Sequence, residues 1–190
     1  MSNTVHIDKR ITKTKNNLKS ALVKLLETNK IEDISIVKLT SYAGVNRKTF
    51  YLHYSDVLSV FKEIEKNAYE QAKKIVVNFE LSSENLEDFL YELYSVFTND
   101  EHVLALIKNT PFANTFTRML DRLLIDEVNK KYSNVHPSVS TPLQYTIAYH
   151  VFGSVRLFYT WIKNNQSLDL RSFSKFLANI VIKGAGGNFE

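Results

Sequence analysis

The sequence SIVKLTSYAGVNRKTFYLHY, residues 35–54, carries the signals that decide the fold of this chain. Ser35 has the side chain of a helix N-cap, and a short helix-compatible run follows it. Gly44 then ends that run, because glycine adopts the positive φ that redirects a chain after a helix. Asn46 can cap another helix, predicted from Arg47 to about Tyr54. The stretch therefore predicts two short helices joined by a tight turn.

Two short helices joined in this way are typical of a helix-turn-helix, whose second helix enters the major groove of DNA. On a helical wheel Phe50 faces the inside of the predicted module, supported by Leu39, Ala43 and Val45. The outer arc carries the residues that DNA would meet, which are Arg47, Lys48, Tyr51 and Leu52, with Thr49 and His53 at its margins. This surface is the predicted nucleic-acid contact.

The segments that flank this stretch predict one helix before it and a longer one after it. Apolar residues recur at helical spacing from about Arg10 to Thr28, and the outer face of that helix carries Lys13, Lys15, Lys19 and Lys24. Asp56 is placed to cap a helix that continues toward Phe79. Residues 1–55 have a net charge of +6 and the remainder −2. A basic front joined to a mildly acidic body favours nucleic-acid binding at the N-terminal end.

The rest of the chain is also patterned as helices, with only five glycines and three prolines. The fold class is therefore all-α, with about nine helices. We expect a helix-turn-helix DNA-binding domain over 9–55 and a larger helical domain for ligand sensing and dimerisation over 56–183. Its helices are predicted at about 83–99, 100–108, 112–131, 142–163 and 169–183, with a loop over 132–141. Lys130 and Lys131 are expected to complement the C-terminus of their own helix.

The segment A-G-V-N-R-K-T-F-Y-L-H-Y, residues 43–54, resembles the signature of the TetR/AcrR family of transcriptional regulators. That signature is a hydroxyl-capped helix followed by A-G-V-S, two variable positions, T, an apolar residue, Y, any residue, H and an aromatic residue. The preceding helix and the chain length of 190 residues also match. The resemblance covers about a quarter of the chain. It implies a ligand-responsive regulator, most often a repressor, that binds a pseudo-palindromic operator in double-stranded DNA as a homodimer.

The resemblance also implies roles for individual residues. Arg47 and Lys48, at the variable positions, would reach base edges, and Arg47 suits bidentate contact with guanine. Thr49, Tyr51 and His53 would contact phosphates or flanking bases; without the rest of the motif, Tyr51 and His53 would be read as packing between helices. The predicted DNA-binding set is completed by Ser35, Asn46 and Tyr54.

One position departs from the family pattern. Family members commonly have a lysine at the start of the fourth helix, where it meets a phosphate, and Val57 stands at the matching position. A missing cation weakens non-specific affinity for DNA and lowers its salt dependence. A second interpretation therefore remains open, in which the DNA module is weakened and the protein acts as a co-regulator through a protein partner.

The helix predicted over 142–163 is apolar on most of its sides, so it must be covered on more than one side. In the family the last two long helices form a four-helix bundle between subunits, and these segments resemble them, although a core within one chain would also explain the pattern. Aromatic residues in this half could line a cavity for a small-molecule effector. The candidate ligand-binding residues are Tyr94, His102, Phe116, Tyr149, His150 and Arg156.

Other function classes find little support in the sequence. No H-E-x-x-H, G-x-S-x-G or glycine-rich phosphate loop occurs, so no enzyme is predicted. The absence of cysteine excludes thiolate metal sites, and we expect no metal and no cofactor. The alternative is a dispersed metal site formed by His102, His136 and His150. No segment reaches the length of a membrane span, so we expect no membrane partner and a cytoplasmic protein.

Overall fold

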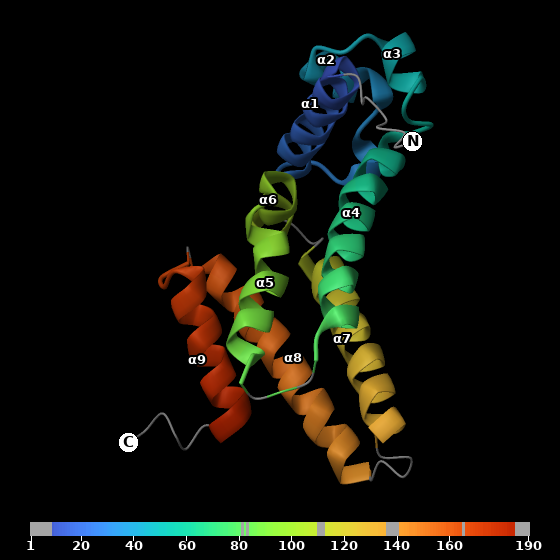
Figure 1. The fold of residues 1–190 in the computed structure, drawn as a ribbon. Coiled ribbons are helices and arrows are strands. Elements are labelled where there is room, and N and C mark those ends of the chain that lie inside the picture. The colour runs from blue at the N-terminus through green and yellow to red at the C-terminus, as the bar shows by residue number, and fades with distance from the viewer. Residues whose placement is uncertain are drawn as a thin grey trace. The chain divides into compact units, whose positions relative to one another are not determined.

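The computed structural model describes residues 9–80, 82, 84–109, 113–135, 141–164 and 166–184. These residues are almost entirely helical and contain no strand, which confirms the predicted all-α fold (Figure 1). The helices of the described residues are α1 (Lys9–Leu26), α2 (Ile36–Ala43), α3 (Arg47–Tyr51), α4 (Val57–Asn78), α5 (Leu86–Thr98), α6 (Glu101–Asn109), α7 (Ala113–Val135), α8 (Thr141–Lys163) and α9 (Leu170–Lys183). A short 3-10 helix, η1 (Ile31–Asp33), precedes α2. The chain forms two compact units, Met1–Lys66 and Asn67–Glu190, whose boundary lies inside α4.

Local hydrogen bonds in the N-terminal unit confirm the predicted helix signals. The Ser35 hydroxyl accepts a hydrogen bond from the backbone N–H of Lys38 at 3.1 Å, which caps α2. Gly44 follows α2 with φ 63° and ψ 31°, the left-handed conformation that lets the chain turn. The Asn46 side chain caps α3 by accepting from the N–H of Lys48 at 2.8 Å. These bonds span no more than three residues, so the local sequence sets the geometry of the turn.

The core of the N-terminal unit is built where α1, α2 and α3 bring their apolar faces together. Leu18 and Leu22 of α1, Leu39 of α2 and Phe50 of α3 have no exposed surface. Phe50 thereby fixes the short helix α3, because its ring is anchored among side chains of the longer helices. The Phe50 ring also lies 5.8 Å from that of Tyr54, measured between centroids.

Two predicted helix ends are wrong. Helix α3 ends at Tyr51, not near Tyr54, because the chain turns after Tyr51 and brings Tyr54 inward onto Phe50. Helix α7 continues to Val135, whereas a loop was expected from Tyr132. No helix-breaking residue occurs between Lys131 and Val135, so nothing local stops the helix there. The remainder of the predicted loop, residues 136–140, lies outside the described residues.

The C-terminal unit has a core of stacked aromatic rings. Helix α5 packs along α9, and α7 packs along α8 (Figure 1). The ring of Tyr94 stacks on that of Phe158 with centroids 3.9 Å apart, and Trp161 stacks on Phe173 at 4.8 Å. The Trp161 indole N–H donates to the backbone carbonyl of Leu168 at 3.0 Å, so its polar atom is satisfied inside this core.

Candidate nucleic-acid interface and ligand cavity

Helix α3 presents a polar and basic arc to solvent in the N-terminal unit. Arg47 and Lys48 are exposed, Tyr51 is 53% exposed and Leu52 is 78% exposed. Thr49 and His53 are half-buried at the margins of this arc, and Phe50 is buried behind it. The inner and outer sides of α3 are therefore those predicted from the helical wheel. Helix α3 thus presents two cations and one phenol to solvent, and the buried Phe50 packs on its other side.

The other residues of the predicted DNA-binding set lie differently. The side-chain oxygens of Ser35 and Asn46 each accept a hydrogen bond from a backbone N–H, so both serve as helix caps. Tyr54 is only 5% exposed and its hydroxyl is buried without a hydrogen-bond partner, which gives this side chain a packing role. Val57 is also buried, at the first residue of α4. That position therefore offers apolar packing and no cation.

A cluster of charged groups ties α1 to α4 within the N-terminal unit. The carboxylate of Glu63 on α4 accepts from Lys15 and from Lys19 of α1, each at 2.9 Å. The Lys15 ammonium also lies 5.4 Å from the centre of the Tyr54 ring. The sequence places Lys15 and Lys19 on the outer face of α1, and the structure adds that both pair with Glu63. Their charges are shared with Glu63, which stands 44 residues or more along the chain and was not foreseeable from helical spacing.

We predict that the Glu63 cluster makes the stability of the N-terminal unit depend on pH. Partial burial raises the pKa of Glu63, but hydrogen bonds from Lys15 and Lys19 and their positive charges more than offset this, so its pKa lies below the ordinary value. A carboxyl group with a lowered pKa stabilises the folded state at neutral pH and loses that contribution as pH falls through its folded pKa.

Thermal unfolding at neutral pH and below about pH 4 checks this prediction. The wild-type protein should lose more stability on acidification than Glu63→Gln, with Glu32→Gln, at an exposed position, as the control. The difference should be modest, because the cluster is partly exposed to water. Equal acid sensitivity in the wild type and in Glu63→Gln would contradict the assignment.

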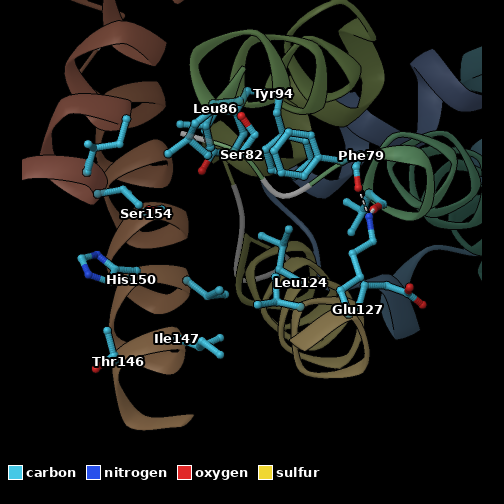
Figure 2. Close-up of a pocket in the computed structure, with 18 residues that line it drawn as sticks. Phe79, Ser82, Leu86, Tyr94, Leu124, Glu127, Thr146, Ile147, His150 and Ser154 are labelled. Carbon is cyan, nitrogen blue, oxygen red and sulfur yellow. Dashed lines mark hydrogen bonds between the residues drawn. The ribbon is translucent and has the colours of Figure 1, made fainter. Parts of the chain in front are cut away.

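The C-terminal unit contains a cavity of about 400 Å³, a size ordinary for a small-molecule site (Figure 2). Most of its lining is apolar and comes from the end of α4, from α5, α7 and α8, and from α9. Its polar side chains are those of Ser82, Tyr94, Glu127, Lys131, Thr146, His150 and Ser154. Figure 2 shows Leu124 on α7 and Ile147 on α8 on facing sides of the space. The cavity can bind an apolar molecule that also carries a polar group.

Of the six candidate ligand residues, Tyr94 and His150 line this cavity. Phe116 is buried in the core, and Tyr149 is 72% exposed on α8. Arg156 is also exposed, with its guanidinium 5.2 Å from the centre of the Tyr159 ring. His102 is buried beside Asp100, which caps α6 by accepting from the backbone N–H groups of His102 and Val103. Its ring and the N–H groups of that cap hold the pKa of Asp100 below its ordinary value.

Neither a metal centre nor a membrane span is found in the part of the chain that the structure describes. No group of three His, Asp or Glu side chains there is arranged to hold a metal ion. His136, one member of the dispersed site considered above, lies outside the described residues. None of the described helices combines the length and apolar character needed to cross a bilayer.

Solved structures of other proteins share this architecture. A TetR transcriptional regulator from Streptococcus agalactiae superposes with a TM-score of 0.60 at 20% sequence identity, over 92% of this chain and 96% of that one. NalD from Pseudomonas aeruginosa, the secondary repressor of the MexAB-OprM multidrug efflux pump, superposes with a TM-score of 0.62 at 18% identity, over 93% and 98%. The chain has the TetR-type regulator fold. Comparisons with models of protein families and with curated proteins gave no match.

A third solved structure with the TetR-type fold is FadR from Bacillus subtilis in complex with stearoyl-CoA. It superposes with a TM-score of 0.60 at 18% identity, over 89% of this chain and 98% of that one. The match of these structures extends through both compact units. Sequence identities of this size establish the fold alone.

Sequence reasoning missed most of the cavity lining within the TetR-type fold. Lys131 is the clearest case, because it was expected to complement its own helix. Its ammonium instead donates to the backbone carbonyl of Val76, at 3.1 Å, in the last turn of α4, and to that of Phe79, the residue after the helix. The only sequence signal was a cation in a helix, which does not reveal a partner more than fifty residues away.

Proposed function

We propose that this protein is a transcription regulator that binds double-stranded DNA through α3. The observation that carries the proposal is the exposed arc of Arg47, Lys48 and Tyr51 on a helix that the buried Phe50 holds in place. Arginine suits bidentate contact with guanine in the major groove, and lysine and tyrosine suit phosphate contacts. The proteins with the same fold that are named above support this assignment, as does the resemblance of residues 43–54 to the family signature.

We propose further that the protein is a homodimer. Exposed apolar side chains gather on α8 and α9, and they are Tyr145, Tyr149, Phe152, Leu157, Phe176 and Ile182. Tyr145, Tyr149 and Phe152 recur at intervals of four and three residues, so they share one face of α8. A second copy of the chain would cover this face. The dimer would present two recognition helices, and the operator would then be a pseudo-palindrome.

The cavity supports a response to a small-molecule effector. An effector regulates DNA binding only if it binds one state of the protein more tightly than the other. FadR from Bacillus subtilis was solved with stearoyl-CoA, and NalD is a repressor, so repression relieved by a cavity ligand is the form of regulation that we propose here. Such a regulator acts on DNA in the cytoplasm and has no catalytic step.

The test of DNA binding uses the intergenic DNA beside the protein's own gene. We expect Arg47→Ala to lower affinity for this DNA by about 10–100-fold, because one bidentate base contact contributes about 1–3 kcal/mol. Lys74→Ala removes the same charge from an exposed position in the C-terminal unit and serves as the control. Fluorescence anisotropy at two salt concentrations measures both. Affinity no higher than for random DNA, with a folded protein, would contradict the proposal.

One observation favours the second candidate, a co-regulator that acts through a protein partner. Val57 is buried where family members commonly place a phosphate-binding lysine, so one cation is missing from the expected DNA surface. The salt dependence of binding distinguishes the two candidates, because each lost phosphate contact lowers its slope by about one unit. We favour the DNA-binding candidate, since Arg47, Lys48 and Tyr51 remain exposed.

A further inference from the structure

Lys131, which lines the cavity of the C-terminal unit, also stabilises the end of a helix. Helix α4 ends at Asn78, and the final carbonyl groups of a helix lack the N–H partners that a further turn would supply. The Lys131 ammonium of α7 donates to the carbonyls of Val76 and Phe79 and so closes this helix end. It also lies 5.7 Å from the centre of the Phe79 ring. A cation at a helix C-terminus is favoured by the helix dipole.

Lys131 is also one of the residues that line the cavity. The stem of Lys131 is half-buried among apolar neighbours, which weakens screening by water. Glu127 also lines the cavity, but its carboxylate lies 4.0 Å from the Lys130 ammonium. Figure 2 shows Leu124 and Glu127 leaving neighbouring parts of α7. The apolar space therefore borders on one ammonium whose present partners are neutral carbonyl groups.

The lining contains a second polar group, the hydroxyl of Tyr94, that lacks a partner. Tyr94 is completely buried, and its hydroxyl has no hydrogen-bond partner. Burial, and to a lesser degree the nearby Asp121 carboxylate, raises the pKa of Tyr94, so its hydroxyl stays protonated and can donate. A buried donor without a partner is costly, and an acceptor atom of a bound molecule would relieve that cost. Two residues of the lining, Tyr94 and Lys131, therefore carry hydrogen-bond donors, an O–H and an ammonium.

We propose that the cavity binds an amphiphile with an apolar body and a single anionic group, that Lys131 binds this group, and that binding draws the ammonium away from the last turn of α4. Helix α4 contains residues of both compact units, so a change at its end can alter DNA binding. That consequence rests on the function proposed above. The recognition of the ligand does not, since it involves the C-terminal unit alone.

Three probes with one chain length and different head groups test the recognition step. Dodecanoate, dodecan-1-ol and dodecylammonium are titrated below their aggregation concentrations, without DNA, by calorimetry. We expect dodecanoate to bind the wild-type protein at least about tenfold more tightly than the alcohol, and the cation to bind most weakly. Equal affinities for the acid and the alcohol would overturn the proposal.

Variants of α7 assign the preference to one side chain. Lys131→Met should reduce the affinity for dodecanoate to that for the alcohol, and Lys131→Arg, which keeps the cation, should retain a preference for the acid. Lys130→Met is the matched control, because it removes an exposed ammonium from the adjacent position. A preference for dodecanoate that persists in folded Lys131→Met would overturn the assignment.

The coupling to α4 has its own measurement. Amide hydrogen exchange should become faster at Phe79, whose N–H donates to Ile75 at 3.0 Å, when dodecanoate binds and not when the alcohol binds. Unchanged exchange at the end of α4 would overturn the coupling. These experiments contain no DNA, so a failure here is distinct from a failure of the DNA-binding test, which contains no amphiphile.

Discussion

Replacement of Phe50 by alanine is expected to destabilise the N-terminal unit by about 3–5 kcal/mol and to abolish DNA binding. The ring is completely buried behind the exposed arc of α3, and no other side chain of that helix is buried. Its loss leaves a cavity that the short helix cannot close without moving. Because α3 has little stability of its own, its orientation depends on this one anchor.

Hydrogen exchange followed helix by helix measures this effect. Amides of α1 to α3 should lose protection in Phe50→Ala, while those of α5 and α9 should change much less, since they belong to the other compact unit. Leu52→Ala, at a position that is 78% exposed, should stay within about 0.5 kcal/mol of the wild type. A Phe50→Ala protein with undiminished protection in α3 would show that Phe50 is not the anchor.

The double variant Tyr149→Glu, Phe152→Glu is expected to convert the proposed dimer into monomers. Both side chains are exposed on one face of α8, so the change should cost a single subunit little. In a dimer each subunit would bury its added carboxylates in an apolar contact, and the two copies would face each other across the twofold axis. DNA affinity should fall with the dimer, because each subunit would then bind one half-site alone.

Analytical ultracentrifugation compares the oligomeric states directly. Tyr42→Glu introduces a charge at an exposed aromatic residue of α2 and should leave the state of the wild-type protein unchanged. A double variant that remains dimeric would place the subunit contact on a different surface from α8. A monomeric wild type would contradict the dimer itself.

Much of the N-terminal unit could be predicted from sequence because its signals act over a few residues. Ser35, Gly44 and Asn46 set the helix caps and the turn through hydrogen bonds and backbone conformation within their own neighbourhood. The inward direction of Phe50 follows from helical spacing. The end of α3 was placed too late, because the inward turn of Tyr54 is a matter of packing in three dimensions.

The candidate cavity was predicted far less completely. Aromatic residues at helical spacing look alike in sequence whether they line a cavity, fill a core or face solvent. The structure places Tyr94 at the cavity, Phe116 in the core and Tyr149 on the surface, although all three were candidates for ligand contact. Whether a given aromatic residue lies in the cavity, the core or the surface depends on which other helix packs against it. The spacing of residues along one helix does not specify that neighbour.

The sequence by itself determined the helices, their caps, the turn before α3 and the basic arc that α3 presents. These features depend on groups within about four residues of one another, where spacing fixes geometry. The tertiary structure decided the partners of the charged groups, joining Lys15 and Lys19 to Glu63, and Lys131 to the end of α4. Such partners lie more than forty residues apart, and only the packing of whole helices brings them together.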